Sequence, residues 1–232
     1  PEPPRASAGK HMLTAVPERD HASGRYVALL VDFGGVLTTN MWEGFDHFCR
    51  SEGIEQGMVR KVFKHDPEAL ADLRMLETGE IEPAEFERRF GPRLGLAETD
   101  GLIARMFAAV APEERVVDAV RAARAAGVRT GLVSNSWGTS IYDPDALEGM
   151  FDAIVISGEV GLHKPQPEIY RLAAKRLGVE PDRCVFVDDL RENVRGAEEV
   201  GMTAVLHRDA DATVNRLEEL LGLSPSAAGG GR

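Results

Sequence analysis

The sequence contains few of the features that mark several protein classes. Only two of its 232 residues are cysteine, which excludes a disulfide framework and a cysteine-built zinc site. No apolar run approaches the roughly 20 residues of a membrane-spanning helix, so we expect no membrane partner. Positive charge is scarce, because 27 Lys and Arg stand against 38 Asp and Glu. The net charge of −11 argues against nucleic acid as a partner, since that binding needs positive surface charge.

The two cysteines, Cys49 and Cys184, both lie among apolar residues. Free cysteine is among the most often buried residue types, and reduced thiols are typical of a reducing compartment. The N-terminal stretch also shows no apolar run after a basic start, which a secretory signal would need. These observations predict two reduced core cysteines and a cytoplasmic protein.

The length suits more than one structural unit. At roughly 150 residues per domain, the chain corresponds to roughly one and a half domains. Residues 1–24 have no apolar period and are rich in Pro, Ala, Ser and charge, so we expect a disordered leader. Residues 224–232, which include PSAAGGGR, are expected to form a disordered tail. Nothing in the sequence specifies an oligomeric state.

Between the two ends, the hydrophobic pattern predicts an α/β protein. The nearly continuous apolar run at 26–31 suits a strand buried on both faces. Residues 41–110 carry apolar residues at helical spacing, and strands and helices alternate after that point. We therefore predict a doubly wound, Rossmann-like parallel sheet built from residues 25–40 and 111–223. An all-helical insertion, residues 41–110, would interrupt this core after its first strand.

Polar side chains follow the predicted strands. Asp32 follows the first strand, Ser134 follows the second, Lys164 lies in a loop after the third, and Asp188 and Asp189 follow the fourth. Each of these alone is more typical of a turn, a helix cap or a solvated loop. In open α/β sheets, however, ligands bind at the carboxyl ends of the strands, so the set is expected to converge on one crevice.

The residue types in this set suit phosphoryl transfer. Acidic oxygens together with a backbone carbonyl form a site for a hard cation such as Mg²⁺. One carboxylate can attack phosphorus and form an aspartyl-phosphate. A lysine and backbone N–H groups can neutralise the phosphoryl group as it transfers.

Four motifs occur in one order: VDFGGVLT, LVSNSWG, GLHKPQPEIY and VFVDDLRENVRGAEEVGM. In this respect the chain resembles the haloacid dehalogenase (HAD)-like hydrolase superfamily, over about residues 27–221. The helical stretch between the first two motifs resembles the inserted cap of subfamily I. The DFGGVL wording is similar to that of sugar-1-phosphate phosphatases and of the phosphatase domain of soluble epoxide hydrolases.

The resemblance implies a role for each motif residue. Asp32 would be the nucleophile and a Mg²⁺ ligand, and Lys164 would orient it. The implied metal ligands are Asp32, the Gly34 carbonyl, Asp188 and Asp189. The implied phosphate-binding residues are Gly34, Gly35, Ser134, Asn135 and Lys164.

One position departs from the most common pattern of the superfamily. Most HAD phosphatases carry a second Asp two residues after the nucleophile, as the acid that protonates the leaving oxygen. This chain has Gly34 there, as do some phosphatase relatives. The leaving group would then need little protonation, as in anomeric sugar, acyl or aryl phosphates. Alternatively a water or a histidine (His163, His47 or His65) would supply the proton.

These observations predict a Mg²⁺-dependent phosphatase for a small phosphorylated metabolite, with sugar phosphates among the candidates. Two alternatives stay open: a HAD-like binding or regulatory module with lost or weak turnover, and a metal-independent 2-haloacid dehalogenase, whose reaction needs no acid. Substrate choice would lie in the cap and near Trp137. There Trp42, Phe45 and Trp137 either stack on the substrate or pack in the core.

Overall fold

A computed structural model describes residues 24–137, 142, 147 and 149–223 of the chain. Apart from Gly24, the predicted leader and tail lie outside these described residues. Both cysteines are buried and free, as predicted. Among the described residues, no helix is both long enough and apolar enough to cross a membrane.

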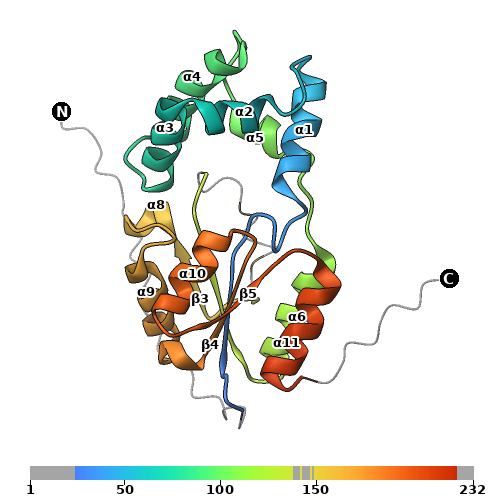
Figure 1. The fold of residues 1–232 in the computed structure, drawn as a ribbon, viewed down its shortest axis with the longest axis vertical. Coiled ribbons are helices and arrows are strands. Elements are labelled where there is room, and N and C mark those ends of the chain that lie inside the picture. The colour runs from blue at the N-terminus through green and yellow to red at the C-terminus, as the bar shows by residue number, and fades with distance from the viewer. Residues whose placement is uncertain (1–23, 138–141, 143–146, 148, 224–232) are drawn as a thin grey trace, which may run out of the picture.

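Five parallel strands form the centre of the molecule, which confirms the predicted fold class (Figure 1). They are β1 (Ala28–Val31), β2 (Arg129–Ser134), β3 (Ala153–Ile156), β4 (Cys184–Asp188) and β5 (Thr203–Leu206). Their order in the sheet is β3-β2-β1-β4-β5, and each neighbouring pair runs parallel. The first strand in sequence therefore lies in the middle of the sheet.

Strand β1 is buried on both faces, as its continuous apolar run predicted. Leu29 and Val31 belong to the hydrophobic cluster on one face, and Ala28 and Leu30 belong to the cluster on the other. Successive side chains of a strand point to opposite faces, so an uninterrupted apolar run is needed when both faces are covered.

Helices cover the two faces of the sheet. On one side lie α6 (Glu114–Ala125) and α11 (Ala210–Leu221), and on the other lie α9 (Pro167–Leu177) and α10 (Arg191–Glu199) (Figure 1). A single-turn helix, α8 (Ser157–Val160), follows β3, and a 3₁₀ turn spans Pro181–Arg183.

Five further helices, which we call the helical block, lie between β1 and α6 in sequence. They are α1 (Met41–Ser51), α2 (Met58–His65), α3 (Pro67–Glu77), α4 (Pro83–Phe90) and α5 (Leu102–Phe107), with a 3₁₀ turn at Gly91–Leu94. They stand over one edge of the sheet (Figure 1). Fully buried side chains such as Phe48, Phe86, Phe90 and Met106 form their own hydrophobic cluster.

Helix α3 is held firmly at its start and on its side. The Asp66 side chain accepts hydrogen bonds from the N–H groups of Glu68 and Ala69, and Pro67 occupies the first turn. The buried Asp72 carboxylate is paired with Arg89 at 2.9 Å and with Arg93 at 2.8 Å. These contacts fix the direction in which the far end of α3 points, toward the sheet.

The end of α3 contacts the sheet layer directly. The Ser157 hydroxyl of α8 donates a hydrogen bond to the backbone carbonyl of Glu77. Gly79 has φ +74°, and a Cβ there would lie only 2.6 Å from the backbone oxygen of Gly158. Only glycine allows this approach, because both the left-handed conformation and the short contact exclude a side chain.

Candidate active site

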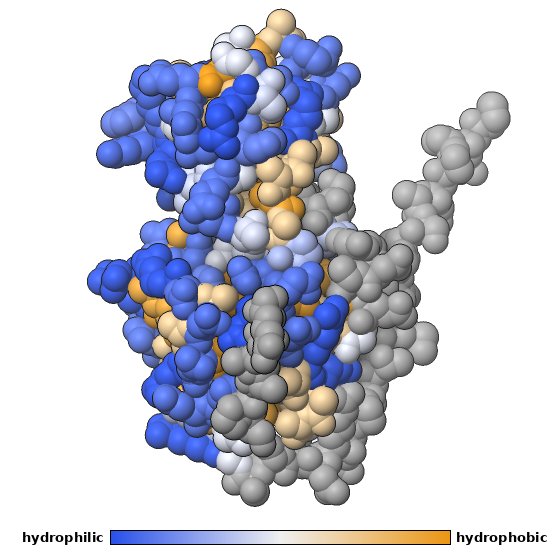
Figure 2. All heavy atoms as spheres, turned by 90° about the vertical axis from the view of Figure 1, so that its right-hand side faces the viewer, coloured by the Kyte–Doolittle hydropathy of each residue, from blue (hydrophilic) through white to orange (hydrophobic). Residues whose placement is uncertain are grey.

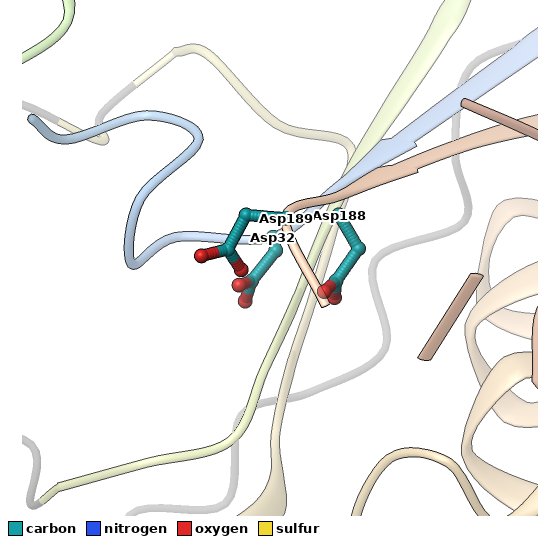
Figure 3. Close-up of side chains that lie close together, drawn as sticks. All are labelled: Asp32, Asp188 and Asp189. Atoms are coloured by element: carbon teal, nitrogen blue, oxygen red, sulfur yellow. The ribbon is translucent and has the colours of Figure 1, made fainter. Parts of the chain in front are cut away.

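Three carboxylates meet at the carboxyl edge of the sheet. Strands β1 and β4 pair with Val31 opposite Val187, so Asp32 and Asp188, the next residues, emerge side by side. One carboxylate oxygen from each of Asp32, Asp188 and Asp189 lies within 4.8 Å of the others. The carboxylates of Asp32 and Asp189 lie together, whereas that of Asp188 points to the other side (Figure 3).

Lys164 joins two of these carboxylates. Its Nζ lies 2.6 Å from Asp32 Oδ1 and 2.7 Å from Asp188 Oδ2, and the residue is only 3% exposed. Lys164 lies in the loop between α8 and α9. A buried ammonium shared by two carboxylates holds both in a fixed orientation.

Both carboxylate oxygens of Asp188 accept hydrogen bonds from neighbouring groups of the protein. Its Oδ1 accepts hydrogen bonds from the Leu190 N–H at 2.8 Å and from Asn193 Nδ2 at 3.0 Å. Its Oδ2 accepts from Lys164 and from Asn193 Nδ2 at 3.1 Å. These bonds tie the start of α10 to the lysine, so the carboxylate of Asp188 faces inward.

Asp189 lies against the backbone of Gly35. A Cβ on Gly35 would lie 2.8 Å from Asp189 Oδ2, and Gly35 has φ +75°. A side chain at this position would displace the carboxylate and strain the turn. Gly35 thus allows Asp189 to lie close to the loop that follows Asp32.

The charges of the site are not balanced by its own cations. Burial raises the pKa of Asp32 to about 7; Lys164 lowers it, and Asp188 and Asp189 raise it. Burial and Asp188 raise the pKa of Asp189 to about 6. Burial would lower the pKa of Lys164, but Asp188 and Asp32 raise it above its ordinary value. Three carboxylates around one lysine can hold a divalent cation of hard character.

The loop after β2 supports the lysine and reaches the helical block. Lys164 N–H donates to Asn135 Oδ1 at 2.8 Å, and Asn135 Nδ2 donates to the Lys164 carbonyl at 3.1 Å. Ser134 accepts a hydrogen bond from the hydroxyl of Tyr142 at 2.9 Å. The buried Ser157 hydroxyl accepts from the Ser136 N–H at 2.8 Å and donates to the helical block, which links the two layers.

A cavity of about 510 Å³ opens above the carboxylates, between the sheet and the helical block. Six of the eight predicted site residues line it: Asp32, Gly34, Ser134, Asn135, Lys164 and Asp189. Gly35 and Asp188 lie behind this lining, where they position Asp189 and Lys164 respectively. The structure thus gathers the predicted residues, which come from four separate segments, at one place.

The predicted histidines separate into two groups. His163 lines the cavity, and its Nδ1 lies 2.8 Å from the Lys164 carbonyl. His47 and His65 are exposed and lie outside the cavity lining. Of the three histidines, His163 alone is therefore placed to act on a ligand in this cavity.

The three aromatic residues named in the sequence analysis lie at the cavity. Trp42, Phe45 and Trp137 all line the cavity. Phe45 is also a buried member of the core of the helical block, and its ring lies 5.5 Å from that of Trp137. The same side chains therefore pack the block and face the cavity.

Glu77 is a cavity residue that sequence reasoning missed. It ends α3 and lines the cavity with Asp32. Burial raises the pKa of its carboxyl to about 7; Lys164 lowers it, and Asp32 raises it. No hydrogen bond or ion pair joins this carboxyl to another side chain among the described residues. One signal was available: a carboxylate in the last turn of a helix opposes the helix dipole, so it is unfavourable without another role.

Comparison with known proteins identifies relatives among phosphatases and larger proteins. The chain is 32% identical over 188 residues to a phosphatase of Mycobacterium tuberculosis, which covers 77% of this chain and 86% of that protein. It is 28% identical over 220 residues to mouse acyl-CoA dehydrogenase family member 10, covering 87% of this chain. The chain spans about a fifth of the length of the first curated relatives it matches.

Solved structures share the fold. A HAD family enzyme of Bacteroides thetaiotaomicron, solved with magnesium and inorganic phosphate, matches with a TM-score of 0.61 at 22% identity. The match covers 79% of this chain and 94% of that one. A family model for haloacid dehalogenase-like hydrolases matches residues 26–201, which span strands β1 to β4 and the carboxylate cluster. The chain therefore belongs to the haloacid dehalogenase-like hydrolase family.

Proposed function

We propose that this hydrolase is a phosphatase that releases phosphate from a small phosphorylated metabolite, with Asp32 as the nucleophile. The observation that carries the proposal is the Asp32 carboxylate, which lies on the floor of the cavity and is held by Lys164 at 2.6 Å. The similarity to a phosphatase over 86% of its length supports this activity. The helical block, within residues 41–110, acts as the cap that covers the substrate.

The residues present fit a Mg²⁺ ion. Asp32, the Gly34 carbonyl and Asp189 would hold it, since all three offer hard oxygen donors. When bound, Mg²⁺ neutralises the clustered carboxylates and the charge of the phosphate group. Asp188 acts through Lys164 or through a water, because its two oxygens already accept four hydrogen bonds from its neighbours.

The chain's own residues then carry out the two steps. A carboxylate oxygen of Asp32 attacks phosphorus, the bond from phosphorus to the alkoxide oxygen breaks, and an aspartyl-phosphate forms. The alcohol departs after taking up one proton. Water then attacks the phosphorus, loses a proton and restores the Asp32 carboxylate as inorganic phosphate leaves. Lys164 and the backbone near Ser134 and Asn135 stabilise the phosphoryl group.

The proton for the leaving oxygen comes from Glu77. Gly34 cannot donate it, and a Cβ there would already contact Met41 Cγ at 3.4 Å. Glu77 lines the cavity from the side opposite the sheet and holds a proton in part at neutral pH, because burial raises its pKa to about 7. His163 is the competing donor, although its Nδ1 is engaged with the Lys164 carbonyl.

Glu77→Gln is expected to slow release of alkyl phosphates by about a hundredfold in kcat, the usual contribution of general acid catalysis. p-Nitrophenyl phosphate should be affected far less, because p-nitrophenolate departs without a proton. The measurement is the ratio of the two rates in each variant. His163→Gln is the matched control and should leave this ratio unchanged. An equal loss on both substrates would show that Glu77 has only a structural role.

The proposed activity is tested by metal removal. Phosphate release from p-nitrophenyl phosphate should stop when a chelator removes divalent cations and return when Mg²⁺ is added in excess. Release that persists at the same rate in chelator would contradict the proposed metal site. Binding of Mg²⁺ and phosphate without any release would favour the binding module, and halide release from 2-chloropropionate in chelator would favour the dehalogenase.

A further inference from the structure

The roof of the cavity is largely apolar. Nine residues of the helical block line it, and two of them, Arg74 and Glu77, are charged. The remaining seven are Met41, Trp42, Phe45, Phe63, Leu70, Leu73 and Phe107. Apart from Arg74 and Glu77, the charged and amide or hydroxyl side chains that line the cavity come from the sheet layer, which holds Asp32 and Lys164, where the phosphate group would lie. The rest of the cavity is lined by apolar side chains, which would contact the group esterified to that phosphate.

Trp137 organises an aromatic wall on this side. It follows β2, and its ring lies 5.5 Å from that of Phe45 and 5.7 Å from those of Phe63 and Phe107. All four side chains line the cavity. Aromatic rings held against one another lose little freedom when a ligand binds, so they make a preformed apolar surface.

Two exposed leucines flank the same cavity. Only three large apolar side chains are exposed in the described part of the chain: Leu70 at 37%, Leu190 at 43% and Ile154 at 36%. Leu70 comes from the helical block and Leu190 from the start of α10, and both line the cavity. Hydrophobic atoms are visible at the narrow waist between the two layers (Figure 2). An apolar ligand would cover both leucines.

A sugar would bind poorly in this space. Each hydroxyl group that loses water without gaining a partner weakens binding by on the order of tenfold. The helical block offers such a group only Arg74 and Glu77, both at the end of α3. A cavity of about 510 Å³ lies within the size range of sites for small molecules.

We infer that the substrate is a phosphate monoester of an apolar alcohol, whose hydrocarbon part lies against Trp137 and beneath Leu70 and Leu73. This inference rests on the proposed phosphatase function and assigns its substrate class. The phosphate lies at Asp32 and Lys164, and the hydrocarbon displaces water from the aromatic wall.

The test uses ethyl, butyl and hexyl phosphate, whose leaving groups have nearly the same basicity. Each added methylene should raise kcat/KM about three- to fourfold until the cavity is filled. Glucose 6-phosphate should be a poorer substrate than hexyl phosphate. In parallel, calorimetry with the matching alkylphosphonates and Mg²⁺ measures the same dependence on chain length without turnover.

Leu70→Gln and Leu190→Gln should each reduce the gain per methylene. Both side chains are exposed, so the polar replacement does not disturb a core. Ile154→Gln is the matched control, because Ile154 is equally exposed but lies outside the cavity lining. It should keep the full dependence on chain length.

The outcomes separate the two proposals. Phosphate release from all three esters with no dependence on chain length would overturn the substrate class and leave the phosphatase function standing. No release from the alkyl esters by enzyme that hydrolyses p-nitrophenyl phosphate would overturn the substrate class. No release from p-nitrophenyl phosphate either would overturn the phosphatase function, and the phosphonate affinities would then decide the class of ligand alone. Alkylphosphonate affinities that do not change with chain length would reject the proposed apolar ligand class.

Discussion

Replacing Asp32 with asparagine is expected to lower kcat by about 10⁴-fold or more, the scale of loss when a covalent nucleophile is removed. The amide has nearly the shape of the carboxylate but is too poor a nucleophile to attack phosphorus. Asp32 is buried beside Lys164 and directly follows the central strand. Among the described residues, no other carboxylate lies at the end of that strand to replace it. Lys164 keeps Asp188 as its ion-pair partner at 2.7 Å, so the main effect of the substitution should be on turnover.

The measurement has two parts. Phosphate release is followed at saturating substrate, and intact mass spectrometry of rapidly acid-quenched enzyme detects the phosphorylated chain. Wild type should show the adduct and Asp32→Asn should not. Asp182→Asn is the matched control, since Asp182 is exposed on the 3₁₀ turn before β4, and it should retain both signals. Comparable turnover by Asp32→Asn would exclude Asp32 as the nucleophile.

Replacing Lys164 with methionine is expected to lower the free energy of unfolding by about 3–5 kcal/mol, the usual loss when one partner of a buried ion pair is removed. The change leaves Asp32 and Asp188 with no ammonium between them, and the Asp188 side chain is fully buried. Urea denaturation of the metal-free protein at neutral pH measures the loss. Lys175→Met, on an exposed residue of α9, should change stability by less than about 0.5 kcal/mol.

Two further measurements show whether the loss of stability in Lys164→Met comes from the broken ion pairs or from lost packing. In the double variant Asp32→Asn with Lys164→Met, one of the two unpaired charges is gone, so part of the stability should return. Lys164 lowers the pKa of Asp32 in the wild type, so without it that pKa rises further above its ordinary value. The folded state then binds more protons than the unfolded state, and the deficit should shrink as the pH falls. If neither the added Asp32→Asn substitution nor a lower pH reduces the loss of stability, that loss comes from packing alone.

Prediction from sequence succeeded where a periodic pattern was long enough. The sequence pattern predicts strands at 153–156 and 203–206 and a helix at 167–177, and β3, β5 and α9 have these boundaries. Each is an apolar or amphipathic segment between clear breakers. Helix α8 was not predicted, because the four residues Ser157–Val160 span only about one turn of helix, whereas four residues of a strand already cover two periods. The segment Pro67–Glu77 was predicted only as part of a series of helices.

The residues that meet around the carboxylates could be predicted from the sequence, but Glu77 and the arrangement of the side chains could not. The positions of Asp32 and Asp188 followed from the rule that parallel strands end at the same edge of a sheet. Their unequal roles did not, because the inward orientation of Asp188 depends on Asn193 and Leu190, which cap it from α10. The need for glycine at position 35 likewise arises from the approach of Asp189, a contact across more than 150 residues of chain.

By itself, the sequence determined the α/β core, the helical stretch after the first strand and the identity of the carboxylates, because these depend on local hydrophobic period and on where each strand ends. Only the tertiary structure decided what lies above those carboxylates. Glu77 reaches the cavity because Ser157, 80 positions later in the chain, binds its backbone, and the apolar roof forms because four helices present side chains to one space. Such contacts join residues with no shared local pattern, so packing alone brings them together.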